Sequence, residues 1–230
     1  MHIKGVLFDL DGTLLDTEPI YNESEQQLVN KYGNGKEIEW AIRVQMMGSS
    51  PLINCKLLID NYQIRLTPEE LLKIRDDLLI EPFKKSKFKK GAKELTHKCK
   101  YELGLKTAIA TSSSKHNFEN KTNHLIDWLK EDIDIVVTSD HKGVKEGKPA
   151  PDIFLLSAKE LGVEPDECIV FEDAISGVEA AIRAGIGIIV VIMEKNMRYL
   201  IEELDYDRNR SKLVVIDSLE EFDFSSLLKY

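Results

Sequence analysis

The sequence predicts an α/β fold, in which a doubly wound, Rossmann-like parallel sheet carries a small all-helical cap domain. Short β-branched runs alternate with segments of helical spacing over most of the chain. The stretch from about residue 18 to about residue 88 breaks this alternation, because its apolar residues recur only at helical intervals. Acidic residues directly follow two of the apolar runs, which is the place where ligands bind at the carboxyl edge of a parallel sheet.

Six apolar runs are predicted as strands, since segments of helical spacing separate them along the chain. The predicted strands are Lys4 to Leu10, Lys106 to Ala110, Asp134 to Thr138, Cys168 to Phe171, Ile186 to Ile192 and Leu213 to Ile216. This order of elements is typical of a parallel sheet with helices on both faces.

The interrupting stretch is predicted to form three helices, around residues 28–32, 52–59 and 67–79. Thr67 and Pro68 are suited to begin the third of these helices. Pro82 and the basic stretch from Lys84 to Gly91 would return the chain to the sheet as a flexible, solvated hinge. The predicted domains are therefore a core of residues 1–16 and 88–230 and a cap of residues 17–87.

Composition restricts the partners and the setting of the protein. The chain has 230 residues, 43% of them hydrophobic, which is enough for one substantial core with a small second domain. Its formal net charge of -9 would repel nucleic acid and anionic membranes, so we predict neither as a partner.

The cysteines and the apolar runs indicate a reduced, cytoplasmic protein. Cys55, Cys99 and Cys168 are odd in number and widely spaced, which favours neither a disulfide framework nor a zinc site. The amino terminus passes directly into an apolar run at 3–8, and the late run at 186–193 is too short to span a bilayer. We expect a cytoplasmic monomer.

Two aspartates one residue apart follow the first predicted strand. Residues i and i+2 of an extended chain point to the same side, so Asp9 and Asp11 could face one metal ion or one substrate atom. Gly12 and Thr13 would then turn the chain away. A simple turn after a strand is the alternative interpretation of these four residues.

Three further motifs stand at strand ends or helix starts. The hydroxyls of Thr111 and Ser112 follow the second strand and could bind an anion, or could belong to an ordinary helix cap. Lys148 precedes two prolines that would stiffen it as a fixed cation, unless it is a surface lysine in a turn. Glu172 and Asp173 end another apolar run, where acids also favour the start of a helix.

Together these residues compose a site suited to phosphate chemistry. Hard oxygen ligands from Asp9, Asp11 and Asp173 suit Mg²⁺, and neither histidine nor cysteine stands among them. Lys148 and the Thr111 hydroxyl could neutralise and position a phosphate. Asp9 would attack phosphorus to form an aspartyl phosphate, and Asp11 would protonate the leaving oxygen and later deprotonate the hydrolytic water.

These motifs resemble, in this order, those of the haloacid dehalogenase superfamily, in particular its magnesium-dependent phosphatases with a helical cap after the first strand. The resemblance covers essentially the whole chain. It implies that the nucleophile is Asp9, the acid/base Asp11, the phosphate-binding hydroxyl Thr111 and the lysine Lys148. It also implies that Asp173, with Glu172 alongside, binds the metal, which the backbone carbonyl of Asp11 would contact.

Longer segments are similar to the pseudouridine-5'-phosphatase, glycerol-1-phosphatase and 2-deoxyglucose-6-phosphatase group. They are residues 147–154, residues 171–181 and the cap segment 46–50. The function that this resemblance implies is Mg²⁺-dependent hydrolysis of a small phosphorylated metabolite.

Three other functions are alternatives to this one. A dehalogenase would keep only the first acid of the Asp9 and Asp11 pair. A phosphomutase of the β-phosphoglucomutase type usually carries a histidine and an arginine where this chain has Tyr21 and Pro51, so its second phosphate would lack a cation. A non-catalytic binding protein on the same scaffold would release no phosphate from p-nitrophenyl phosphate.

The cap is expected to choose the substrate, because a lid over the sheet edge would contact the leaving group. Its polar candidates for binding a sugar, a polyol or a nucleoside are Glu18, Tyr21, Asn22, Gln45 and Ser49. The alternative is that each is an ordinary surface residue. A small helical lid fits small metabolites better than phosphoproteins, which would need an open cleft.

Overall fold

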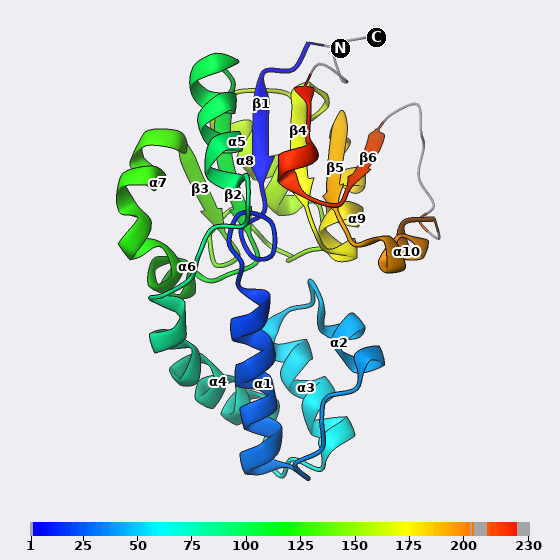
Figure 1. The fold of residues 1–230 in the computed structure, drawn as a ribbon. Coiled ribbons are helices and arrows are strands. Elements are labelled where there is room, and N and C mark those ends of the chain that lie inside the picture. The colour runs from blue at the N-terminus through cyan, green and yellow to red at the C-terminus, as the bar shows by residue number, and fades with distance from the viewer. Residues whose placement is uncertain (1, 203, 205–210, 225–230) are drawn as a thin grey trace.

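A six-stranded parallel sheet forms the centre of the molecule in the computed structural model, which describes residues 2–202, 204 and 211–224 (Figure 1). The strand order is β3-β2-β1-β4-β5-β6. The strands are β1 (Gly5–Phe8), β2 (Lys106–Thr111), β3 (Ile135–Thr138), β4 (Cys168–Glu172), β5 (Ile188–Ile192) and β6 (Lys212–Ile216). All six predicted strands are present, with ends shifted by one or two residues, so the predicted doubly wound fold is confirmed.

The two strands that end in acids are neighbours. β1 pairs with β4 in parallel, and Phe8 lies opposite Phe171 in the register. Their rings stack with centroids 5.3 Å apart. Because parallel neighbours in register end at the same level, Asp9 and Glu172 leave the sheet side by side.

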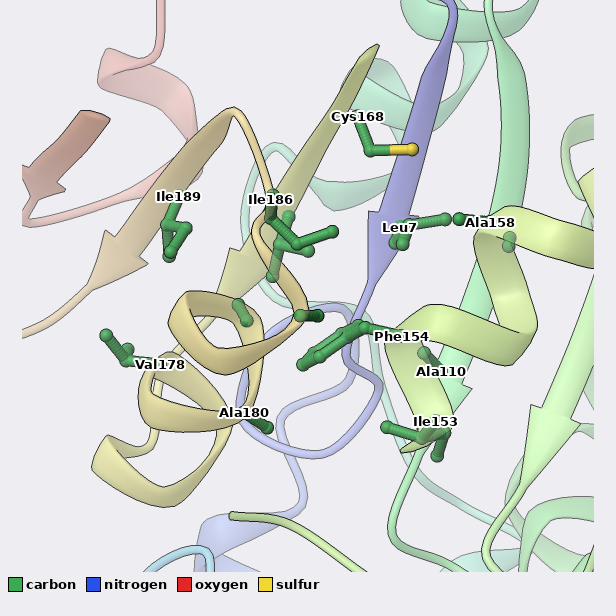
Figure 2. Packing of buried hydrophobic residues seen from close by; sticks show 14 of the residues in the cluster. Leu7, Ala110, Ile153, Phe154, Ala158, Cys168, Val178, Ala180, Ile186 and Ile189 are labelled. Carbon is green, nitrogen blue, oxygen red and sulfur yellow. The ribbon is translucent and has the colours of Figure 1, made fainter. Parts of the chain in front are cut away.

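Helices cover both faces of the sheet, and the strand residues alternate between two apolar clusters. Leu7 belongs with Phe154 and Ala180 to the apolar cluster on one face (Figure 2). Phe8 packs with Leu95 and Trp128 on the other face. The core helices are α5 (Ala92–His97), η1 (Lys98–Glu102), α6 (Lys115–Thr122), η2 (Asn123–Leu125), α7 (Ile126–Asp132), α8 (Asp152–Leu161), η3 (Pro165–Glu167), α9 (Ile175–Ala184), η4 (Lys195–Met197), α10 (Tyr199–Glu202) and η5 (Leu219–Glu221).

Four helices lie together beyond the carboxyl ends of the strands (Figure 1). They are α1 (Glu18–Tyr32), α2 (Trp40–Met46), α3 (Pro51–Tyr62) and α4 (Pro68–Phe83). Leu28, Leu58 and Leu71 belong to a separate apolar cluster that joins them. We refer to residues 17–87 as the cap.

The sequence predicted three cap helices and missed α2. That helix has seven residues and a single buried one, Met46, so it carries no apolar periodicity. The start of α4 is as predicted, because Thr67 and Glu70 form reciprocal side-chain to backbone hydrogen bonds. Pro82 lies inside α4, which ends one residue later.

The two connections between cap and core are hydrogen-bonded to each other. The Asp16 N–H donates to the Lys87 carbonyl at 2.8 Å, and the Lys89 N–H donates to the Leu14 carbonyl at 2.9 Å. Ser86 is buried and its hydroxyl donates to a backbone carbonyl of α6. Four lysines of this basic stretch, Lys84, Lys85, Lys87 and Lys90, are exposed, while its backbone is hydrogen-bonded; the hinge itself stays a prediction. Within the described residues, no helix is both long enough and apolar enough to cross a bilayer.

Candidate active site

A cavity of about 450 Å³ lies between the carboxyl edge of the sheet and the cap. Its core lining includes the ends of β1, β2, β4, β5 and β6 and the loop before α8. Those residues include Asp9, Asp11, Gly12, Ser112, Ser113, Lys148, Glu172 and Asp173. Segments that are far apart in the chain thus meet at one place because the sheet is parallel.

Lys148 is a buried cation between two carboxylates. Its Nζ donates to Asp9 Oδ1 at 2.6 Å, to Glu172 Oε1 at 2.6 Å and to the Ala110 carbonyl at 3.1 Å. The side chain is 3% exposed. Burial disfavours the charged form, but Asp9 and Glu172 outweigh it and raise the pKa of Lys148. The alternative of a surface lysine in a turn is therefore wrong.

Carboxylate oxygens of Asp9, Glu172 and Asp173 lie within 4.8 Å of one another. Burial raises the pKa of Asp9 to about 7, with Lys148 opposing this and Glu172 and Asp11 adding to it. Burial, Glu172 and Asp9 raise the pKa of Asp173 well above its usual value. This cluster carries more negative charge than Lys148 alone can offset, so its donor set fits a divalent cation.

Both oxygens of Glu172 already have partners. Oε1 accepts from Lys148, and Oε2 accepts from the backbone N–H groups of Asp173 and Ala174 at 3.0 Å each. Asp9 and Asp173 are therefore the carboxylates that can offer oxygens to a cation, while Glu172 holds Lys148 and shapes the turn into α9.

Two glycines lie so close to these carboxylates that a side chain at either position would collide with them. A Cβ on Gly12, which has a φ of +82°, would lie 2.0 Å from Asp173 Oδ2. A Cβ on Gly177 would lie 1.7 Å from Glu172 Oε1. The close approach of backbone to carboxylate thus requires glycine at both positions.

The Asp11 carboxylate lies outside the three-carboxylate cluster of the described residues. It accepts from Lys121 Nζ at 2.6 and 2.7 Å, from Thr17 Oγ1 at 2.8 Å and from Ser113 Oγ at 2.9 Å. Burial would raise its pKa, but Lys121 and the hydroxyls outweigh burial and lower it. The two aspartates of one short motif therefore occupy opposite electrostatic environments.

Some of the hydroxyl residues in the loop after β2 line the cavity, and others accept hydrogen bonds from backbone N–H groups. Ser112 and Ser113 line the cavity. Thr111 is fully buried, and its Oγ1 accepts from the Ser113 N–H at 3.1 Å. Ser114 caps α6 by accepting from the Asn117 N–H, so the helix-cap interpretation of this motif holds for Ser114.

The cap lines the cavity with four of its five predicted residues, Glu18, Tyr21, Asn22 and Ser49. Gln45 is not brought to the cavity, because it is exposed and its Nε2 donates to the Ala41 carbonyl within α2. The cavity also has six polar or aromatic cap residues that the sequence interpretation missed, namely Thr17, Glu25, Trp40, Arg43, Asn54 and Arg75.

A sequence signal existed for one of the missed cap residues. Glu18, Tyr21, Asn22 and Glu25 follow the spacing i, i+3, i+4 and i+7, which is one face of a helix. No comparable pattern singles out Arg43 or the others.

Arginines of the cap are paired with polar neighbours. Arg75 is buried, and its Nη2 donates to Glu25 Oε1 at 3.3 Å. Arg43 Nη1 donates to Asn22 Oδ1. Both cationic and anionic side chains therefore line the cap side of the cavity.

A direct hydrogen bond joins the loop between α2 and α3 to the core. Ser176 Oγ, in α9, donates to the Gly48 carbonyl at 2.6 Å. A Cβ on Gly48, which has a φ of +68°, would lie 2.5 Å from this hydroxyl oxygen. The cap therefore reaches the core through a backbone contact that a side chain at position 48 would disrupt.

Comparison with known proteins agrees with this geometry. A family model described as haloacid dehalogenase-like hydrolase matches residues 3–185. The chain belongs to this family. The superfamily predicted from the sequence is thereby confirmed.

Relatives with curated names indicate the class of reaction. A protein of Arabidopsis thaliana named (DL)-glycerol-3-phosphatase 1, mitochondrial, is 36% identical over 82% of this chain, which corresponds to 64% of that protein. A Saccharomyces cerevisiae protein named "Probable pseudouridine-5'-phosphatase" is 34% identical over 82% of each chain. The predicted class, a phosphatase of this family that resembles the glycerol- and pseudouridine-phosphatase group, is confirmed.

Among solved structures, β-phosphoglucomutase from Clostridium difficile superposes with a TM-score of 0.76. The match covers 98% of this chain and 95% of that one at 22% identity, which is a likeness of fold.

Proposed function

We propose that the protein is a Mg²⁺-dependent phosphatase of small phosphomonoesters that works through an aspartyl phosphate on Asp9. The observation that carries this proposal is the buried Lys148 ammonium held between Asp9 and Glu172, 2.6 Å from each, at the wall of a closed-over cavity. Such a fixed cation neutralises a phosphate and orients the carboxylate that attacks it.

Asp9 is the nucleophile in this proposal. It follows the central strand β1, its backbone N–H donates to the Phe171 carbonyl at 2.9 Å, and Lys148 fixes one of its two oxygens. The other oxygen remains for in-line attack on phosphorus, after which the alcohol leaves and water later releases phosphate. A rigid strand end thus places the attacking atom.

The residues that would hold Mg²⁺ are Asp9, Asp173 and the backbone carbonyl of Asp11. When bound, the ion supplies positive charge that favours ionised carboxylates and offsets the charge of the phosphate oxygens. The raised pKa values of Asp9 and Asp173 support this assignment, because a nucleophilic carboxylate must be ionised at neutral pH.

Asp11 carries the proton in the proposed reaction. In the structure its carboxylate turns toward Lys121 and has a lowered pKa, which suits the step in which it takes a proton from water. In the first step the protonated form of the same group gives its proton to the leaving oxygen, and Lys121 then holds the carboxylate that results.

The substrate side of the cavity favours the phosphate ester of a sugar, a polyol or a nucleoside. Its volume of about 450 Å³ suits a small molecule rather than a folded phosphoprotein. Asn22, Asn54 and Ser49 offer neutral polar groups there, and the charges of Glu25 and Arg75 are paired with each other. This environment matches a neutral leaving group that carries hydroxyls or amides.

Phosphate release from p-nitrophenyl phosphate tests the activity, and we expect it to require Mg²⁺. With EDTA the rate should fall by about 100-fold or more, because the carboxylate cluster then lacks its counter-charge. Restoring Mg²⁺ should restore the rate. A purified protein that releases no phosphate with Mg²⁺ would instead support the non-catalytic binding function.

A phosphomutase is the second candidate, favoured by the likeness to β-phosphoglucomutase. The sequence argument that a second phosphate would lack a cation was incomplete, because Arg43 and Arg75 both line the cap side of the cavity. Glu25 already neutralises Arg75, and Pro51 offers no charge, which favours hydrolysis.

Product analysis separates the two reactions. With β-glucose 1-phosphate and a trace of glucose 1,6-bisphosphate, we expect inorganic phosphate and no glucose 6-phosphate. Accumulation of glucose 6-phosphate in step with enzyme concentration would establish the mutase.

A further inference from the structure

Lys121 is a fully buried lysine for which the proposed reaction has so far required no role. It lies on α6, where Phe118 and Thr122 are also buried, so it occupies a core-facing position of that helix. A lysine is almost never buried unless its charge is compensated. The buried face of α6 has one apolar residue, Phe118, so periodicity alone did not single out Lys121 in the sequence.

The ammonium of Lys121 has three protons and three polar partners. Nζ lies 2.6 and 2.7 Å from the two Asp11 oxygens, 2.6 Å from Ser113 Oγ and 2.7 Å from the Tyr21 hydroxyl. No N–H remains for a substrate phosphate. Lys121 is also absent from the described residues that line the cavity. Any role in the reaction must therefore act through these partners, and Asp11 is the one that transfers a proton in the proposed reaction.

The partners of Lys121 come from both the core and the cap. Asp11 and Ser113 belong to core loops, whereas Tyr21 belongs to α1 of the cap. The Phe83 ring, at the end of α4, lies 4.6 Å from Nζ, and the Tyr21 ring lies 5.2 Å from it. Two cap helices thus surround the charge that holds Asp11.

We propose that Lys121 is the positioning residue that fixes the Asp11 carboxylate for proton transfer and that Tyr21 and Phe83 link this hold to the cap. The inference rests on the proposed function, since it assumes that Asp11 transfers the proton. A displaced cap would move Tyr21 and Phe83, and the hold of Lys121 on Asp11 would change with them. The Lys121 side chain thus connects the cap, which is expected to choose the substrate, to Asp11, which transfers the proton.

Two esters of similar shape test the proposal. The p-nitrophenolate group leaves without needing a proton, whereas phenolate is more basic and gains from one. In Lys121→Met, which keeps the apolar stem, kcat/KM for phenyl phosphate should fall about tenfold more than kcat/KM for p-nitrophenyl phosphate. Lys115→Met is the matched control, because Lys115 is exposed on the same helix, and both values should stay unchanged.

Thermal unfolding of Lys121→Met establishes that the variant folds. Equal losses on the two esters, or no loss, in the folded variant would overturn the proposal. Where Lys121→Met does not fold, Tyr21→Phe decides, because it removes one hydrogen-bond partner and keeps the ring. It should show the same preference, with a difference of a few fold, and equal losses would again contradict the proposal. A wild-type protein that hydrolyses neither ester in Mg²⁺ overturns the proposed function and this inference together.

Discussion

Asp9→Asn should abolish turnover while the protein stays folded. Asparagine keeps the shape of the side chain and removes the attacking oxygen, so the rate of phosphate release should fall about 10⁴-fold or more. The melting temperature should not fall, because burial, Glu172 and Asp11 together raise the pKa of Asp9, so its negative charge is not favoured in the folded protein without metal. Phosphate release and thermal unfolding monitored by circular dichroism measure the two effects.

Acid quenching of the wild-type reaction provides a second measurement. Mass spectrometry should find a phosphoryl group on the peptide that contains Asp9, and none in Asp9→Asn. Asp166→Asn is the matched control, since this exposed aspartate stands at the opposite end of β4 and should keep full activity. Substantial activity in Asp9→Asn would exclude Asp9 as the nucleophile.

Lys148→Met should lower both activity and stability. The phosphate loses its fixed cation, so the rate should fall about 10²- to 10³-fold. Asp9 and Glu172 lose the buried charge that compensates them, which we expect to cost about 3–5 kcal/mol of unfolding free energy without metal. Denaturant unfolding in EDTA measures this cost.

Added Mg²⁺ should recover part of the lost stability, because a cation bound only by the native state raises its unfolding free energy. Lys145→Met in the same loop is the control, since its side chain is exposed and should tolerate the change. An unchanged rate in Lys148→Met would show that this lysine does not serve the reaction.

Much of the core could be predicted because its signals are local. Each strand is a short apolar run, and the residues that follow a parallel strand must emerge at one edge of the sheet. Asp9 and Asp173 were found in this way, and Lys148 was found from the two prolines that follow it. The partner of Asp11 was not, because Lys121 is 110 residues away and only the folded chain brings them together.

The cap was harder to predict because it depends on how short helices are rotated. Gln45 was predicted at the cavity, yet Arg43 lies there instead. Residues at i and i+2 of a helix face different directions, and seven residues with one buried position do not fix the orientation of α2. The longer α1 has a regular spacing, and three predicted residues on its inward face, Glu18, Tyr21 and Asn22, do line the cavity.

The paired connections between cap and core make the cap a separable module. Asp16 and Lys87 are hydrogen-bonded at 2.8 Å, so the 71-residue cap, residues 17–87, begins and ends at one point of the core. Domain insertions are tolerated where the ends of the inserted segment lie this close. Another set of helices could occupy the same gap without moving the strand ends that handle phosphate. With the proposed function, such an exchange of helices would change the choice of substrate and leave the chemistry the same.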